Sequence, residues 1–138
     1  MTDETRNALI DKALEMLRYS YTPYSRFKVG AALLAKNGSI YGGCNIENAA
    51  YTPSNCAERT AFFRAVAEGV TEFEAIAVTG GHEGNVTAYT TPCGVCRQVM
   101  MEFCNPDTFR VIVAIDRDNY REYTLKEILP EGFGPANL

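Results

Sequence analysis

Three cysteines and one glutamate have the types and spacing needed for a metal centre with a proton carrier beside it. Cys93 and Cys96 are three residues apart, which places both sulfurs on one face of a first helical turn. Pro92 just before them is typical of a helix start, and Cys56 supplies a third sulfur. Thiolates at a helix start are favoured by free N–H groups and by the positive end of the helix dipole.

The number of cysteine ligands indicates what such a metal would do. Zinc takes four protein ligands when it is structural, but three and an open position when it does chemistry. The sequence offers three well-placed cysteines and no evident fourth ligand. Glu58, two residues after Cys56, can take a proton from water at the open position and hand it to a substrate. The alternative is that Cys56 is a buried small residue and Glu58 an ordinary acid of a first helical turn.

Two helices are expected to carry these residues. The first fills residues 57–68, with Ser54 or Asn55 as its cap and Gly69 as its end. The second covers residues 93–104. The cysteines and Glu58 therefore lie where these two helices begin, and the sequence predicts the site there.

The other elements follow from hydrophobic periodicity and turn residues. We expect further helices over residues 4–19 and 124–130, and strands over residues 29–35, 39–43, 75–79, 109–115 and 120–123. Asn37-Gly38 predicts a tight hairpin turn, and Thr124 with Glu127 forms a capping-box signature. This order predicts one α/β domain over residues 1–138, with a mixed five-stranded sheet in a three-layer α/β/α arrangement.

Composition narrows the class of protein. A chain of 138 residues with 46% hydrophobic residues is typical of one domain with a proper core. The net charge is −4 and no basic run occurs, which argues against nucleic-acid and anionic-membrane partners. A polar beginning indicates no signal peptide, and five cysteines without one indicate metal ligands and spare thiols in a reducing compartment. We therefore expect a cytoplasmic protein.

A polar stretch after the hairpin offers a second kind of chemistry. Asn45 and Glu47 alternate around Ile46, so their side chains share one face of an extended segment. An amide and a carboxylate together can hold a sugar hydroxyl as donor and acceptor. They can equally satisfy local backbone groups, and spacing alone favours this second interpretation. Phe27, just before the first strand, is by default a core aromatic.

Four blocks and a tail resemble the zinc-dependent cytidine deaminase superfamily. They are Tyr24–Leu33, Gly43–Tyr51, Cys56–Ala61, Pro92–Gln98 and Leu129–Phe133. The superfamily signature described for polynucleotide and nucleoside deaminases has His where Cys56 stands. An all-cysteine site is similar to that of the small, homotetrameric cytidine deaminases.

The resemblance implies an activity and a cofactor. The expected reaction is hydrolytic deamination of cytidine and deoxycytidine to uridine and deoxyuridine, with release of ammonia, as in pyrimidine salvage. One Zn²⁺ per chain would be held by Cys56, Cys93 and Cys96. Glu58 would be the catalytic acid and base, moving protons from water to the pyrimidine N3 and then to the departing ammonia.

The resemblance also assigns the substrate contacts. Phe27 would pack against the pyrimidine, Asn45 and Glu47 would hold the ribose, and Ala57 would contribute main-chain contacts. Tyr51 and Phe133 would reach a neighbour's substrate in a homotetramer. Their ordinary interpretations are a loop tyrosine and an apolar anchor near the C-terminus.

Three thiolates on Zn²⁺ sum to a net charge of −1, which opposes ionisation of a bound water. Arg59, directly after Glu58, can draw off thiolate charge, and Gln98 is a second candidate donor. From composition alone Arg59 could equally be a surface charge. His82 is expected to be a solvated loop residue, and Cys44 and Cys104 to be buried small residues.

Two other functions remain open at this point. One is a structural zinc module without catalysis, which would leave Glu58 without a role. The other is a deaminase of a related small substrate, such as a nucleoside-like aminopyrimidine antibiotic or a nucleotide. Asn45 and Glu47 favour a substrate with a sugar hydroxyl.

Overall fold

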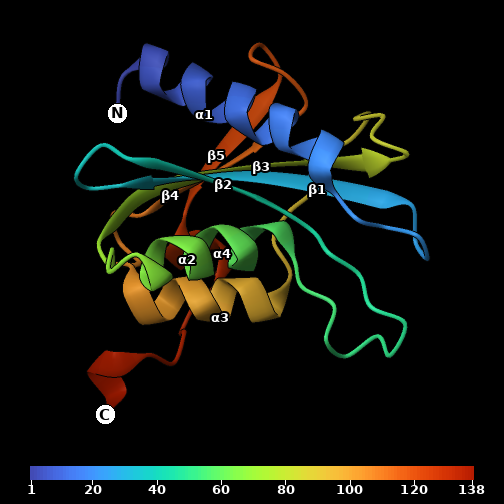
Figure 1. The fold of residues 1–138 in the computed structure, drawn as a ribbon. Helices are drawn as coiled ribbons and strands as arrows, with labels where there is room; N and C mark the ends of the chain where they lie inside the picture. Colours follow the sequence, from blue (N-terminus) through green and yellow to red (C-terminus); the bar gives the residue numbers. More distant parts are fainter.

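The computed structural model describes all 138 residues and has a five-stranded sheet at its centre (Figure 1). The strands are β1 (Phe27–Ala35), β2 (Ile40–Cys44), β3 (Phe73–His82), β4 (Arg110–Ala114) and β5 (Tyr120–Thr124). Their order in the sheet is β2-β1-β3-β4-β5. Only β3 and β4 pair in parallel, and the other neighbours are antiparallel. The predicted mixed sheet is confirmed.

Helices cover both faces of this sheet (Figure 1). Helix α1 (Asp3–Met16) lies on one face and continues into a 3₁₀ turn at Leu17–Tyr19. Helices α2 (Ala57–Ala67) and α3 (Gly94–Phe103) lie on the other face with the short α4 (Leu125–Ile128). A last 3₁₀ turn, Pro135–Asn137, ends the tail. The α/β/α prediction is confirmed.

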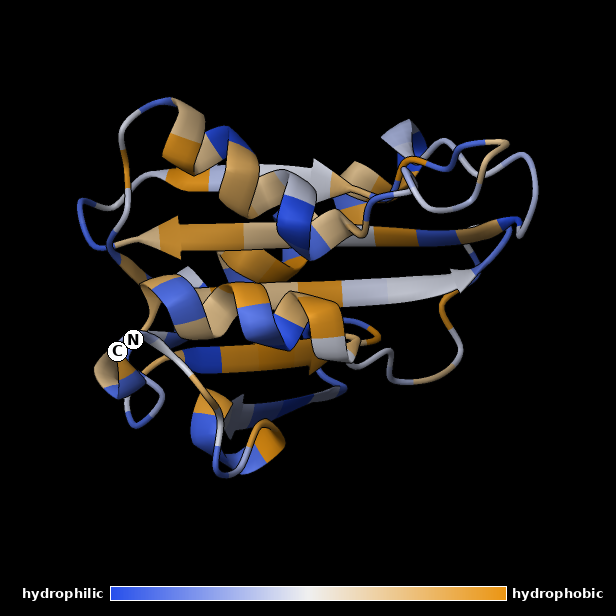
Figure 2. Cartoon of the chain, turned by 90° about the horizontal axis from the view of Figure 1, so that it is seen from below, coloured by the Kyte–Doolittle hydropathy of each residue, from blue (hydrophilic) through white to orange (hydrophobic).

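Alternating strand residues build a core on each face. In β1, Ala31 and Leu33 pack toward α2 and α3, whereas Ala32 and Leu34 pack toward α1. This follows from the two-residue period of a strand. Figure 2 shows that the middles of the strands are mostly hydrophobic, as expected for a sheet covered on both faces.

Short-range signals predicted several element ends correctly. Gly38 has a positive φ of 91° in the β1–β2 turn. Gly69 has φ 85° just past α2, and the N–H groups of Gly69 and Val70 donate back to the last turn of the helix as a Schellman motif. The Thr124–Glu127 capping box is present at α4. Each of these features is encoded within a few residues.

Strands β1 and β3 are longer than predicted. β1 begins at Phe27, two residues early, because Phe27 pairs with His82 and Lys28 with Gly81. Gly80 and Gly81 are weak strand formers and lie beyond the predicted strand 75–79, but pairing with β1 keeps them in the sheet. A β-carbon at Gly81 would lie 1.9 Å from the Asn85 carbonyl oxygen, so the following loop folds tightly against this glycine.

None of the helices combines the length and the hydrophobicity that a membrane span requires.

Candidate metal centre and active site

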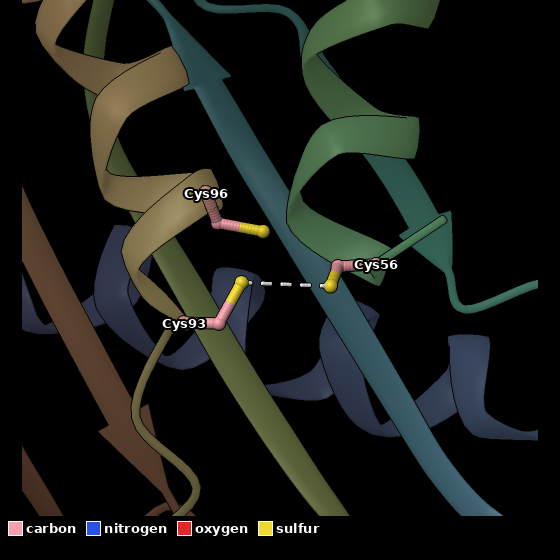
Figure 3. Close-up of side chains that lie close together, drawn as sticks. All are labelled: Cys56, Cys93 and Cys96. Atoms are coloured by element: carbon pink, nitrogen blue, oxygen red, sulfur yellow. Dashed lines mark hydrogen bonds between the residues drawn. The ribbon is translucent and has the colours of Figure 1, made fainter. Parts of the chain in front are cut away.

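The three cysteines meet where α2 and α3 begin (Figure 3). Cys56 is the N-cap residue of α2, Cys93 is the N-cap residue of α3, and Cys96 lies in the first turn of α3. The prediction that Ser54 or Asn55 caps α2 is wrong. Their side chains bond elsewhere: the Ser54 hydroxyl accepts from the Asn48 N–H, and the Asn55 amide donates to the Thr60 hydroxyl.

The sulfur positions fit a zinc ion. The Cys56 and Cys93 sulfurs lie 3.8 Å apart, and all three sulfurs lie within 4.8 Å of one another. Tetrahedral zinc with Zn–S bonds of about 2.3 Å requires sulfurs about 3.8 Å apart. No fourth His, Cys, Asp or Glu joins this cluster. The set therefore suits three-ligand zinc with one position left for a small molecule.

Arg59 lies against the sulfur cluster. Its Nη2 donates to the Cys56 sulfur at 3.2 Å. The neighbouring Cys96 thiol and the Arg59 hydrogen bond lower the pKa of the Cys56 thiol. Arg59 therefore contacts one of the three sulfurs, and its effect on the charge of the ligand set stays a prediction.

Glu58 is a buried carboxyl in the first turn of α2, with only 3% of its surface exposed. Burial raises the pKa of Glu58 to about 7. A carboxyl group in this range can accept a proton and release it again near neutral pH.

One cavity of about 390 Å³ contains Glu58 and two of the cysteines. This volume lies within the range of about 300–1,000 Å³ that is usual for small-molecule sites. The lining residues are Val29, Asn45, Glu47, Ser54, Asn55, Cys56, Ala57, Glu58, Arg59, Thr90, Thr91 and Cys93. Two residues of the sulfur cluster, the Glu58 carboxyl group and the Asn45/Glu47 pair therefore line the same cavity.

Asn45 both lines the cavity and ties its own loop to β1. Its Oδ1 accepts from the Val29 N–H at 2.9 Å, and its Nδ2 donates to the Phe27 carbonyl at 2.7 Å. The Asn45 side chain therefore does satisfy local backbone groups, as the second interpretation of the sequence expected. An amide oxygen has two lone pairs and an amide nitrogen two protons, so Asn45 keeps one acceptor and one donor for a ligand.

Glu47 accepts three hydrogen bonds from one neighbouring loop. Its Oε1 accepts from the N–H groups of Tyr24 at 3.0 Å and Ser25 at 3.1 Å, and its Oε2 accepts from the Ser25 hydroxyl. These bonds, that of the Ser25 hydroxyl above all, lower the pKa of Glu47. The carboxylate is therefore ionised where it lines the cavity.

Three residues that are expected to contact the substrate do not line the cavity. Phe27 is 38% exposed, Tyr51 is 73% exposed and Phe133 is 58% exposed. Tyr51 has a positive φ of 63°, and its ring packs edge-on against Tyr24 with centroids 6.1 Å apart. Phe27 is not the core aromatic that its position suggested by default.

Gln98 differs from its expected role. Its side-chain amide donates to the Phe133 carbonyl at 2.8 Å, so it holds the C-terminal segment rather than a thiolate. It has this partner because Gln98 lies on the exposed part of α3, over which the tail passes, whereas Cys96 is buried.

Two of the three remaining candidates match their expectations, and His82 does so only in part. Cys44 and Cys104 are buried and lie outside the sulfur cluster. His82 is exposed and is not part of the cluster, but it ends β3 rather than lying in a loop.

Sequence reasoning missed part of the cavity wall, namely Val29, Ser54, Asn55, Thr90 and Thr91. Thr90 and Thr91 directly precede Pro92-Cys93, so their closeness to the motif was an available signal. The Thr90 hydroxyl donates to the Gly80 carbonyl at 3.3 Å, which ties the approach to α3 to the end of β3.

The fold and the site define a class: an α/β/α protein with a three-cysteine zinc site and a buried carboxyl beside it. Residues 3–113 match the family model described as the cytidine and deoxycytidylate deaminase zinc-binding region. The chain belongs to this family of zinc-binding deaminases.

Individual relatives cover nearly the whole chain. A cytidine deaminase of Sporosarcina psychrophila is 48% identical over 94% of this chain and 92% of its own. A probable cytidine deaminase of Dictyostelium discoideum is 39% identical over all of this chain and 90% of its own. The crystal structure of a cytidine deaminase from Burkholderia pseudomallei superposes with a TM-score of 0.84, at 44% identity over 96% of this chain and all of that one.

Proposed function

We propose that this chain catalyses the zinc-dependent hydrolytic deamination of cytidine and deoxycytidine, giving uridine or deoxyuridine and ammonia. One observation carries the proposal. A cluster of three cysteines without a fourth protein ligand shares a cavity with a buried glutamate that is not part of the cluster. The names of the relatives supply the substrate class.

Cys56, Cys93 and Cys96 would hold the zinc. When bound there, zinc acts as a Lewis acid that makes a coordinated water more acidic. Arg59 moderates the charge of this ligand set through its hydrogen bond to the Cys56 sulfur.

Glu58 would perform the proton transfers. It takes a proton from the attacking water and places it on N3 of the pyrimidine, while the water oxygen bonds to C4. It then carries the second proton of the water to the amino group, so that the C4–N bond breaks and ammonia leaves. Burial supports this role, since a carboxyl away from bulk water exchanges its proton with the substrate rather than with solvent.

Asn45 and Glu47 would hold the sugar. Both line the cavity, and each keeps hydrogen-bonding capacity after its contacts with β1 and the neighbouring loop are counted. Ala57 is fully buried at the cavity wall. Because its side chain is apolar, only its main chain would form polar contacts with the substrate. Phe27 would pack against the pyrimidine. Its partial exposure, two residues before the cavity residue Val29, is compatible with this contact.

We also propose a homotetramer in which Tyr51 and Phe133 reach a neighbouring subunit's site. Both rings are largely exposed and neither lines the cavity of its own chain. Both rings are therefore available for contact with a neighbouring subunit. Light scattering that gives an active species of single-chain mass would contradict this assembly. Five free cysteines suit a reducing compartment, and we propose the cytoplasm.

The function is tested by following the loss of cytosine absorbance with cytidine, deoxycytidine, cytosine, cytidine monophosphate and adenosine. We expect turnover of the first two and little with the others. Glu58→Gln, with its zinc content measured, is the control for contaminating activity. Zinc-loaded protein that releases ammonia from no nucleoside would overturn the proposal and favour a structural zinc module. Selective turnover of another aminopyrimidine would replace the substrate but keep the chemistry.

A further inference from the structure

The loop that precedes β1 surrounds the Glu47 carboxylate with hydrogen-bond donors. Two of them are main-chain N–H groups, of Tyr24 and Ser25, and the third is the Ser25 hydroxyl. Loop and carboxylate are more than 20 positions apart in the chain, so tertiary structure brings them together. Ser25 is the only side chain among these donors, and hence the only one that a substitution can remove cleanly.

The Ser25 hydroxyl has its orientation fixed from both sides. Its single proton goes to Glu47 Oε2, and its oxygen accepts from the Phe27 N–H at 3.0 Å. Ser25 therefore links the carboxylate to the first residue of β1. The same strand presents Val29 to the cavity.

The backbone next to Ser25 is in an unfavourable conformation. Arg26 has a φ of 60°, which a residue with a side chain adopts rarely. Two hydrogen bonds hold it there, from the Arg26 N–H to the Thr22 carbonyl at 3.0 Å and from the Glu83 N–H to the Arg26 carbonyl at 2.7 Å. Such conformations persist where the surroundings fix them, and they concentrate at functional sites. Arg26 directly follows Tyr24 and Ser25, whose N–H groups both donate to Glu47.

Counting acceptors shows what the loop leaves free. An ionised carboxylate offers about four lone-pair positions, two on each oxygen. Tyr24 and Ser25 N–H groups occupy both positions on Oε1, and the Ser25 hydroxyl occupies one on Oε2. About one acceptor position therefore remains, on Oε2, for a ligand in the cavity.

We propose that Ser25 is a positioning residue that sets the selectivity of the site for a hydroxylated sugar. It does not contact the substrate. It fixes the orientation of the Glu47 carboxylate and leaves a single acceptor, which suits the O–H of one sugar hydroxyl. This inference rests on the proposed function, in which Glu47 binds the sugar.

The test compares two substrates on the same variant. Ser25→Ala is assayed with cytidine and with 2′,3′-dideoxycytidine, which lacks the ring hydroxyls. We expect kcat/KM for cytidine to fall about tenfold, mainly through KM, because a hydrogen bond to a charged group is lost. The value for dideoxycytidine should stay within about twofold, so the ratio of the two falls. Ser25→Thr, which keeps a hydroxyl, should restore the ratio.

Ser20→Ala is the matched control for a structural effect. Ser20 precedes the same loop, and its hydroxyl donates to the Val29 carbonyl at 3.0 Å without contacting Glu47. Its loss should change both substrates by the same factor and leave the ratio unaltered. An equal fall for both substrates in Ser25→Ala would overturn the positioning role.

Glu47→Gln separates this inference from the function beneath it. If Glu47→Gln lowers the cytidine preference while Ser25→Ala does not, the inference on Ser25 is wrong and the sugar contact stands. If Glu47→Gln leaves the preference unchanged, the sugar contact itself is wrong and Ser25 loses its role with it. A wild-type chain that deaminates neither substrate would overturn the proposed function and the inference together.

Discussion

Helix α1 on one face of the sheet and helix α2 on the other both approach the strands at a glycine. A β-carbon at Gly30 in β1 would lie 2.0 Å from the Ala13 carbonyl oxygen of α1. One at Gly43 in β2 would lie 2.3 Å from the Ala57 carbonyl oxygen of α2. The two layers thus use the same close backbone contact, yet reactive side chains gather on only one of them.

The difference lies in which part of the helix meets the sheet. Helix α1 is in contact through its last turn, at Ala13, which is buried with Leu9 and Ile10 in an entirely apolar cluster. Helix α2 is in contact through its first turn, next to Cys56 and Glu58. A first turn has free N–H groups and a positive dipole end, which favour thiolates and carboxylates, whereas a last turn has free carbonyl groups and a negative dipole end. The same close packing of a helix on a glycine therefore serves stability at α1 and chemistry at α2.

The largest effect should come from the reactive face. Cys93→Ala should lose both zinc and activity, since three-ligand binding depends on every thiolate. Cys104→Ala, at the opposite end of the same helix and outside the sulfur cluster, should keep its zinc. Elemental analysis of the two purified variants makes the comparison. Full zinc content in Cys93→Ala would show that the ligand assignment is wrong.

Glu58→Gln should separate chemistry from metal binding on the same face. The amide keeps the size of the side chain but cannot carry protons, so kcat should fall by roughly 10²–10⁴-fold. Zinc content should be unchanged, because the carboxyl is not part of the sulfur cluster. Single-turnover assays with zinc measured on the same sample provide the test. Wild-type turnover in this variant would exclude Glu58 from the reaction.

Leu9→Ala should produce the opposite pattern on the α1 face. Leu9 is fully buried in the core beneath α1. Its truncation should lower the free energy of unfolding by about 2–5 kcal/mol. At a temperature where the variant stays folded, kcat and zinc content should equal those of the wild type. A fall in kcat without local unfolding would mean that the two faces of the sheet are coupled and do not have separate roles.

The two glycines offer the most closely matched pair, and the smallest expected effects. Gly30→Ala should cost about 1–3 kcal/mol of stability, as overpacking does, without changing zinc affinity. Gly43→Ala should cost a similar amount and should also weaken zinc binding, by roughly 10- to 100-fold, as changes around metal ligands do. Chelator competition on both variants measures this difference. Equal zinc affinities would show that the α2 contact only packs the helix.

Much of this arrangement could be predicted from the sequence, because its signals are local. The spacing of Cys93 and Cys96, the turn at Gly38, the helix end at Gly69 and the capping box at Thr124 each involve only a few neighbouring residues. The three-cysteine cluster also needed the resemblance, since nothing in local spacing brings Cys56 to α3.

What could not be predicted depends on partners distant in the chain. The extra length of β3 comes from pairing with β1, which outweighs the weak strand propensity of Gly80 and Gly81. The contacts of Glu47 with the loop of Tyr24 and Ser25 span more than 20 positions. The bond between Gln98 and the Phe133 carbonyl spans 35. Composition and periodicity carry no information on such pairs.

The position of the sulfurs has a further consequence for the folding of the chain. Cys56 and Cys93 are 37 positions apart, with the whole of β3 between them. An ion held by both is also a cross-link, which closes a long loop and reduces the conformational freedom of the unfolded chain. At a free ion concentration 100 times its Kd, such binding raises the free energy of unfolding by about 2.7 kcal/mol. A chain stripped of its zinc thus loses a tether between two helices at the same moment as its reactivity.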